Sequence, residues 1–282
     1  MEKPINSEIR FLHHGFNLQA FRSRPVAELK ALSESPNYRM QAQGGIAVIP
    51  VRGPINRGEG YYGETDMYDV IRNCETARND PSISGAMFVF DSPGGTASGC
   101  AAVASSIADL SASKPTVGYS FMCCSAAYYM ASQVRRLYSS ADAMNGSIGT
   151  TTEMIDMSEY YSKNGIKVTT IDTGDYKNVG HDSRPLTEED IAYVQGLIDD
   201  LYAGFVKSVA SGRKMTQQSV KDLQAKVYIG AKAIDVGLID GVASMGDVMT
   251  QFAKSVSKTM PKTNAMRSRE LMLSRAKLQH YK

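Results

Sequence analysis

Short apolar runs alternate with longer stretches of helical periodicity from residue 45 onward. Apolar, β-rich runs predict strands at 46–51 (IAVIPV), 86–90 (AMFVF), 115–120 (PTVGYS) and 136–139. Helices are predicted at 64–79, at 97–112 and from about Ser125 onward. Strands that alternate with helices of this length pair in parallel through right-handed crossovers. The pattern therefore predicts an α/β fold.

Beyond Gly146 the pattern predicts a helix at about 153–164, a strand at 166–172 (IKVTTID) and a long helix from Thr187 to about 210. Thr187 precedes three acidic residues, which is typical of a helix N-terminus. The stretch 228–240 predicts a short helix stopped by Gly237, followed by a terminal strand. We expect an N-terminal extension at 1–43, a single domain at 44–250 and a basic C-terminal tail at 251–282.

Chain length and cysteine content indicate whether the fold depends on disulfides or a metal site. A chain of 282 residues buries a full hydrophobic core without disulfides. The four cysteines show neither CxxC spacing nor a paired histidine pattern, so we predict free thiols, no metal site and no cofactor; they are Cys74, Cys100, Cys123 and Cys124.

Charge and hydropathy at the two ends bear on location and partners. The first forty residues hold no apolar run as long as a signal-peptide core or a membrane span, which predicts a cytoplasmic protein without membrane contact. Residues 254–282 hold eight Lys or Arg and one acid, Glu270. Such a tail suits an acidic partner, but a solvated terminus is the commoner role, and we do not expect nucleic-acid binding.

The motif DSPGG, Asp91–Gly95, stands where one predicted strand ends and a helix begins. In open α/β sheets the carboxyl ends of strands are the usual place for a site. Consecutive glycines let backbone amides approach a ligand closely, as an oxyanion hole requires. The same residues also make an ordinary strand-to-helix turn, so both interpretations stay open.

A second candidate is Ser125 in CCSAAYYMAS, at the predicted start of a helix. The exposed amides and dipole of a helix N-terminus stabilise negative charge that develops beside it. A serine here is placed as a nucleophile, although an N-cap serine is the commoner role.

A serine nucleophile needs a base, and histidine is scarce. His13, His14 and His280 lie near the termini, and His181 follows Lys177 without a recognisable orienting carboxylate. GxSxG does not occur around Ser125. A lysine serves instead where burial leaves it neutral.

Four motifs in order, SPGG, SAAYYMAS, GSIG and GxYK, resemble the serine-lysine peptidase family of signal peptide peptidase A, including its phage relatives that mature procapsids. The resemblance covers about residues 45–245. It implies a Clp protease/crotonase-like α/β fold with parallel sheets and crossover helices. It also implies that Ser125 is the nucleophile, that Lys177 is the base 52 positions later, and that Ser147 holds the lysine in place. The implied oxyanion hole uses Gly94 or Gly95 with the amide of Ala126.

The resemblance further implies a polypeptide substrate and a homo-oligomeric ring, in which the lysine reaches a serine of its own or of a neighbouring protomer. We expect a phage prohead protease that cuts scaffold, portal or coat protein, located in the host cytoplasm or the procapsid interior. Three alternatives stay open: a cytoplasmic peptidase that degrades signal peptides, a crotonase-type hydratase or isomerase, and a non-catalytic capsid assembly protein. The presence of both Ser125 and Lys177 argues against the last two.

Overall fold

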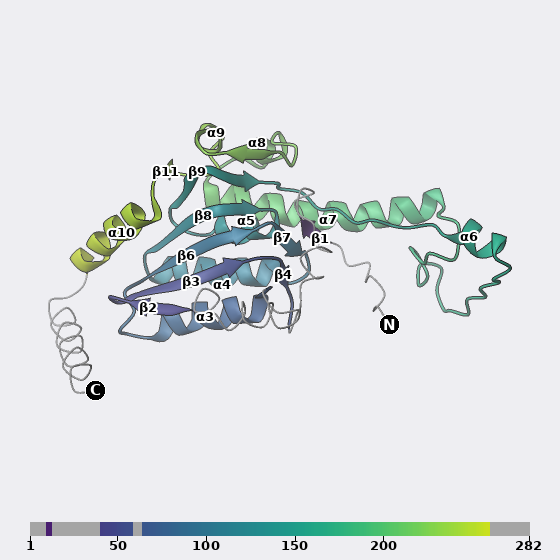
Figure 1. Ribbon diagram of the computed structural model, residues 1–282, viewed down its shortest axis with the longest axis horizontal. Helices are drawn as coiled ribbons and strands as arrows, with labels where there is room; N and C mark the ends of the chain where they lie inside the picture. Colours follow the sequence, from purple (N-terminus) through teal and green to yellow (C-terminus); the bar gives the residue numbers. More distant parts are fainter. Residues whose placement is uncertain (1–9, 13–39, 59–63, 260–282) are drawn as a thin grey trace.

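The computed structural model describes residues 10–12, 40–58 and 64–259. A seven-stranded sheet forms the body of this part of the chain, in the order β10-β9-β8-β6-β3-β2 with β11 beside β9 (Figure 1). The central strands β3, β6, β8 and β9 are parallel neighbours, and this confirms the predicted α/β class. The strands are β2 (Gln41–Gln43), β3 (Ile46–Arg52), β6 (Gly85–Ser92), β8 (Thr116–Cys124), β9 (Leu137–Gly146), β10 (Val227–Ile229) and β11 (Gly241–Val242).

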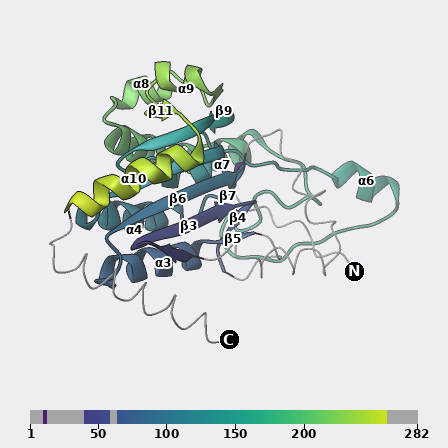
Figure 2. The same cartoon turned by 60° about the vertical axis from the view of Figure 1, so that its left-hand side comes forward.

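Helices cover both faces of this sheet because the side chains of its strands alternate between two cores. In β6, Phe88 and Phe90 join the core under the crossover helices, whereas Met87 and Val89 face the opposite side. The crossover side carries α3 (Met67–Asn79), α4 (Cys100–Ser113), α5 (Ala126–Ala131) and the second half of α7 (Glu188–Arg213), while α10 (Met245–Thr259) covers the other face (Figure 2).

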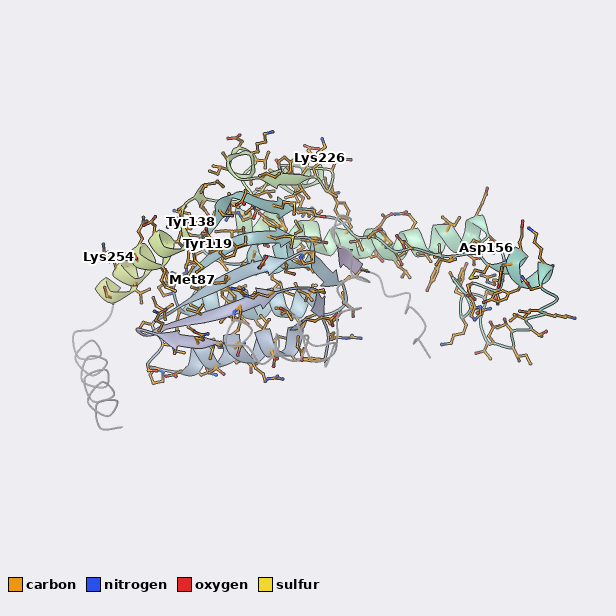
Figure 3. The ribbon with its side chains drawn as sticks, viewed as in Figure 1. Met87, Tyr119, Tyr138, Asp156, Lys226 and Lys254 are labelled. Carbon is orange, nitrogen blue, oxygen red and sulfur yellow. The ribbon has the colours of Figure 1, made fainter. Side chains whose placement is uncertain are left out.

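Helix α10 extends past residue 250, where we placed the end of the domain. Its residues Val248, Phe252 and Val256 are buried against the sheet. Figure 3 shows Met87, Tyr119 and Tyr138 on the sheet face next to this helix. Burial of each apolar side chain of this size stabilises the fold by roughly 1.5–3 kcal/mol, so the first part of the expected basic tail belongs to the packed body.

A small second sheet stands beside the end of β6. Its order is β1-β7-β4-β5, formed by Arg10–Leu12, Gly94–Thr96, Ile55–Asn56 and Thr65–Asp66. Strand β7 consists of the two glycines of the SPGG motif and Thr96. The only described part of the expected N-terminal extension besides residues 40–43 is β1, which pairs with β7.

The arm, defined as residues 150–187 with the first half of α7, projects away from the sheet (Figures 1 and 2). Helix α7 has 26 residues, a length of about 39 Å. Its buried apolar residues, Phe205, Val206, Val209 and Ala210, all lie in the second half. The arm also carries the short helix α6 (Ser158–Lys163), near which Asp156 is seen in Figure 3.

The start of α7 is confirmed, one predicted strand is absent, and another strand is longer than predicted. Helix α7 begins as predicted, with Thr187 as N-cap in a reciprocal capping box with Asp190. The predicted strand at 166–172 does not form: the segment is irregular and its apolar residues are exposed, Ile171 by 96%. Strand β9 continues to Gly146, well past the predicted end at residue 139.

Two short helices, α8 (Gln217–Lys221) and α9 (Ala231–Asp235), complete the described elements of the body.

All four cysteines are free and buried, as predicted. No helix in the described ranges has the length and apolar character needed to cross a membrane.

Candidate active site

The candidate site lies at the carboxyl ends of β6, β8 and β9. Ser92 at the end of β6 is in register with Cys123 of β8, and Cys124 is in register with Gly146 of β9. Parallel pairing therefore places the SPGG turn, Ser125 and Ser147 at one edge of the sheet, although these motifs are far apart in the sequence.

Ser125 connects β8 to α5 through a backbone conformation that side chains rarely adopt, with φ 55° and ψ −120°. Its amide donates to the Gly146 carbonyl at 2.8 Å, which ties this turn to the end of β9. The residue is 1% exposed, and its Oγ has no hydrogen-bond partner among the described residues. A buried hydroxyl without a partner costs about 1–3 kcal/mol, so the fold holds Ser125 at an energetic cost.

Strand β7, which begins with Gly94 and Gly95, packs against α5, the helix that directly follows Ser125. The Gly94 amide donates to Ser92 Oγ at 3.2 Å, so it can bind an oxyanion only by giving up or sharing that bond. A Cβ on Gly95 would lie 1.9 Å from the Ile55 carbonyl oxygen, and only glycine fits there. Ala126 begins α5, where helical N–H groups lack an intrahelical acceptor. The oxyanion hole at these residues remains a prediction.

Ser147 follows Gly146 directly and is half-buried. Its φ is 53°, and its amide donates to the Lys226 carbonyl at 3.0 Å. The same region is fixed from within the sheet by buried Asn145, whose Oδ1 accepts from Ser120 Oγ at 2.7 Å. The motif NGSIG contains this asparagine, but its supporting role was not predicted, since the partner Ser120 lies on another strand.

Lys177 lies on the arm, apart from Ser125. It is exposed, and its amide donates to the Gly174 carbonyl at 3.2 Å within a tight turn. Tyr176 fixes this turn to α7, because its hydroxyl donates to Glu189 at 2.8 Å and its ring stacks on Tyr193. Ser125 Oγ has no hydrogen-bond partner in the described chain, so no hydrogen bond joins Lys177 to Ser125 within one copy.

No hydrogen bond joins His181 to a carboxylate in the described part of the chain. Its Nδ1 lies 3.4 Å from an Asp182 carboxylate oxygen, but this nitrogen accepts a hydrogen bond from the Ser183 amide at 3.3 Å and lies 2.8 Å from Ser183 Oγ. His181 also lies on the arm and is exposed.

The thiols beside Ser125 do not compete with it as nucleophiles. Burial raises the pKa of the Cys124 thiol to about 12 and that of Cys123 well above its usual range. Both thiols therefore stay protonated near neutral pH, and a thiol is a far weaker nucleophile than a thiolate. Among the described residues no cluster of three or more His, Cys, Asp or Glu is arranged to hold a metal ion.

The sequence of this chain is similar to those of known proteases. Residues 108–259 match the family described as Peptidase family S49. A protein of Methanocaldococcus jannaschii named as a "putative protease" is 30% identical over 210 residues, or 73% of this chain and 68% of its own length. Capsid assembly protease C of Escherichia phage lambda is 30% identical over 215 residues, or 74% of this chain. The match spans 49% of that phage protein.

Solved structures align more distantly. An enoyl-CoA hydratase from Shewanella pealeana aligns with a TM-score of 0.49 at 12% identity, over 87% of this chain and 83% of its own. A ClpP1 variant from Listeria monocytogenes aligns with a TM-score of 0.44 at 13% identity, over 71% of this chain and 92% of its own. We draw no functional argument from similarities this low. On the match to the family profile and the identity to the archaeal relative, the chain belongs to peptidase family S49.

Proposed function

We propose that this chain is a serine endopeptidase in which Ser125 is the nucleophile and Lys177 is the general base. The observation that carries the proposal is the state of Ser125: a positive φ and a buried hydroxyl without a partner in the described chain. Both features cost free energy, and such costs persist mainly at functional sites. Membership of a peptidase family supports the same chemistry.

The position of Lys177 supports a base supplied by a neighbouring copy. Lys177 is exposed on an arm that projects from the body, whereas Ser125 is buried in the body (Figure 1). In a ring of identical subunits a heterologous contact places the arm of one copy against the body of the next. Burial of a lysine at such a contact favours the neutral form that acts as a base.

The proposed reaction is amide hydrolysis through an acyl-enzyme. Neutral Lys177 accepts the proton of Ser125 Oγ as that oxygen attacks the scissile carbonyl carbon. Backbone amides of Gly94 or Gly95 and of Ala126 hold the oxyanion, and Ser147 positions the lysine. The lysine then protonates the leaving amine. A water molecule, deprotonated by the same lysine, cleaves the ester and restores the serine.

The proposed biological role is maturation of a phage prohead by cleavage of scaffold, portal or coat protein, in the host cytoplasm or inside the procapsid. The name of the lambda relative, a capsid assembly protease, supports this role by analogy. Degradation of signal peptides is the alternative. Parallel digestion of purified scaffold protein and a synthetic signal peptide separates the two, since each role predicts cleavage of one and not the other.

The proposed dyad is tested by labelling with a fluorophosphonate and by cleavage of labelled casein. We expect Ser125→Ala and Lys177→Ala to lose both signals, with activity reduced by about three orders of magnitude or more. His181→Ala is the matched control, since it changes a neighbouring basic side chain on the same arm, and it should retain activity. Loss of activity in His181→Ala with retention in Lys177→Ala would instead make histidine the base.

Mixing the two inactive variants tests whether the base comes from another copy. A Lys177→Ala copy still holds the serine and a Ser125→Ala copy still holds the lysine, so random mixing restores about one quarter of wild-type activity in a ring. A mixture that stays inactive beside an active wild type would place both groups in one copy. Absence of labelling in every variant and assembly state would favour the non-catalytic assembly protein.

A further inference from the structure

Strand β7 has two edges, and β4 covers one of them. Gly95 is in register with Ile55 of β4. The approach is so close that a Cβ on Gly95 would meet the Ile55 carbonyl oxygen at 1.9 Å and its nitrogen at 2.6 Å. An extended peptide therefore has no access from this side. Any peptide that pairs with the glycines of β7 must use the other edge.

That other edge is occupied by the chain's own strand β1. The two strands are antiparallel, with Arg10 opposite Thr96, Phe11 opposite Gly95 and Leu12 opposite Gly94. The carboxyl end of β1 is thus directed toward Gly94 and the turn beside Ser125. Strand β1 has three residues, lies at the end of its sheet and pairs only with β7 in the described chain.

We propose that β1 occupies the place of the substrate, so that this strand acts as a built-in competitor for the active site. The inference rests on the proposed function, in which Gly94 or Gly95 binds the oxyanion. An extended peptide binds an exposed sheet edge through backbone hydrogen bonds, and a strand already on that edge must leave first. A pairing of only three residues is short enough to be displaced.

The fraction of copies with a free edge sets the measured affinity for any peptide. When the competent state is a minor one, the apparent dissociation constant is the intrinsic constant divided by that fraction. Removal of the β1 backbone donors should therefore strengthen peptide binding without any change at β7. Proline removes these donors and is poorly tolerated in a paired strand.

The test uses the full chain with Ser125→Ala, so that binding is measured without cleavage. The probe is a fluorescein-labelled peptide with the sequence of residues 8–14, followed by fluorescence anisotropy. One variant carries Arg10→Pro, Phe11→Pro and Leu12→Pro together. The matched control carries alanine at the same three positions and keeps every amide. We expect the proline variant to bind the peptide at least about fivefold more tightly than the alanine variant.

Equal affinities, or no binding of the peptide to any variant, would overturn the proposal. A second measurement needs no substitution in β1: hydrogen exchange of the amides of residues 10–12 in the Ser125→Ala chain. Saturating peptide should accelerate their exchange because it displaces β1, and unchanged protection would contradict the inference. Failure of the proposed function is recognised separately. In that case the wild-type chain, which keeps Ser125, shows no peptidase activity although the Ser125→Ala chain binds the peptide as expected.

Discussion

Two buried serines, Ser120 and Ser125, differ in the hydrogen bonds of their hydroxyl groups and therefore in their effect on stability. Ser120 Oγ donates to Asn145 Oδ1 at 2.7 Å, and this bond fixes β9 beside β8. Ser125, five positions later, has a buried hydroxyl with no partner in the described chain and a backbone at φ 55°. The first hydroxyl stabilises the fold, whereas the second and its backbone conformation cost free energy.

These opposite roles predict opposite changes in stability. Ser125→Gly removes the unpartnered hydroxyl and relieves the positive φ, so the free energy of unfolding should rise by about 1–2 kcal/mol while peptidase activity is lost. Ser120→Ala leaves Asn145 Oδ1 without its donor and should lower the free energy of unfolding by about 1–2 kcal/mol. Urea unfolding of the three chains measures both. Destabilisation by Ser125→Gly would show that Ser125 is an ordinary structural residue.

At the scale of elements, α7 joins the arm to the body. Its second half is anchored, with the ring of Phe205 stacked on Tyr129 at 4.6 Å between centroids. At its end, Arg213 pairs with Asp240 at 2.9 Å, and that carboxylate also accepts from the Leu137 amide at 2.7 Å. The position of the turn that carries Lys177 thus depends on contacts at the far end of a single rigid helix.

The Asp240 contacts predict a pH dependence of stability. Burial alone raises the pKa of Asp240, but the Leu137 amide and the Arg213 guanidinium outweigh it and hold the pKa below its usual range. A lowered folded-state pKa stabilises the protein above the unfolded value, near 4, and this contribution disappears as the pH falls through the folded value. Asp240→Asn should therefore cost about 3 kcal/mol at pH 7, and the difference from wild type should shrink below about pH 4.

Urea unfolding from pH 7 down to pH 3 tests this prediction. Asp109→Asn is the control, because Asp109 is exposed and lies 4.0 Å from Arg78, so its effect should stay within about 0.5 kcal/mol. A cost for Asp240→Asn that does not change with pH would contradict the ionic origin.

The sequence predicts elements well where local pattern and burial agree. The runs that form β3, β6 and β8 are apolar because both faces of these strands are covered. Helix α7 begins where predicted because the Thr187 side chain accepts a hydrogen bond from the Asp190 amide. The predicted strand at 166–172 is rich in β-branched residues, but within the described ranges it pairs with no strand, and Ile171 stays exposed. A three-residue strand such as β1 has no local signal at all.

For the candidate site, the family resemblance implied that Ser125, Ser147 and the two glycines act together. The parallel register of β6, β8 and β9 brings the segments that carry them to one edge of the sheet. The positive φ of Ser125, the Gly94 bond to Ser92 and the separation of Lys177 from the body arise from three-dimensional packing. Composition and spacing do not encode them.

On the scale of the whole molecule, a body with two packed cores carries an arm whose apolar side chains are exposed. Ile155, Ile166 and Ile171 are among them. Contiguous exposed apolar patches mark interaction sites, and we expect these side chains to form part of one. Under the proposed function the surface that covers the arm belongs to the next copy in a ring.

This arrangement predicts which surface substitution disrupts assembly. Ile171→Glu should shift the protein toward smaller species in sedimentation velocity and reduce specific activity, because a charge cannot be buried there without cost. Ile229→Glu is the control, since Ile229 is 52% exposed on the body and not on the arm. Equal behaviour of both variants would argue against the arm as the contact.

Under the proposed function, the separation of Ser125 from Lys177 sets when proteolysis starts. A copy in dilute solution then holds a nucleophile without its base. Activity on this proposal begins only where copies accumulate, so local abundance acts as the timing signal.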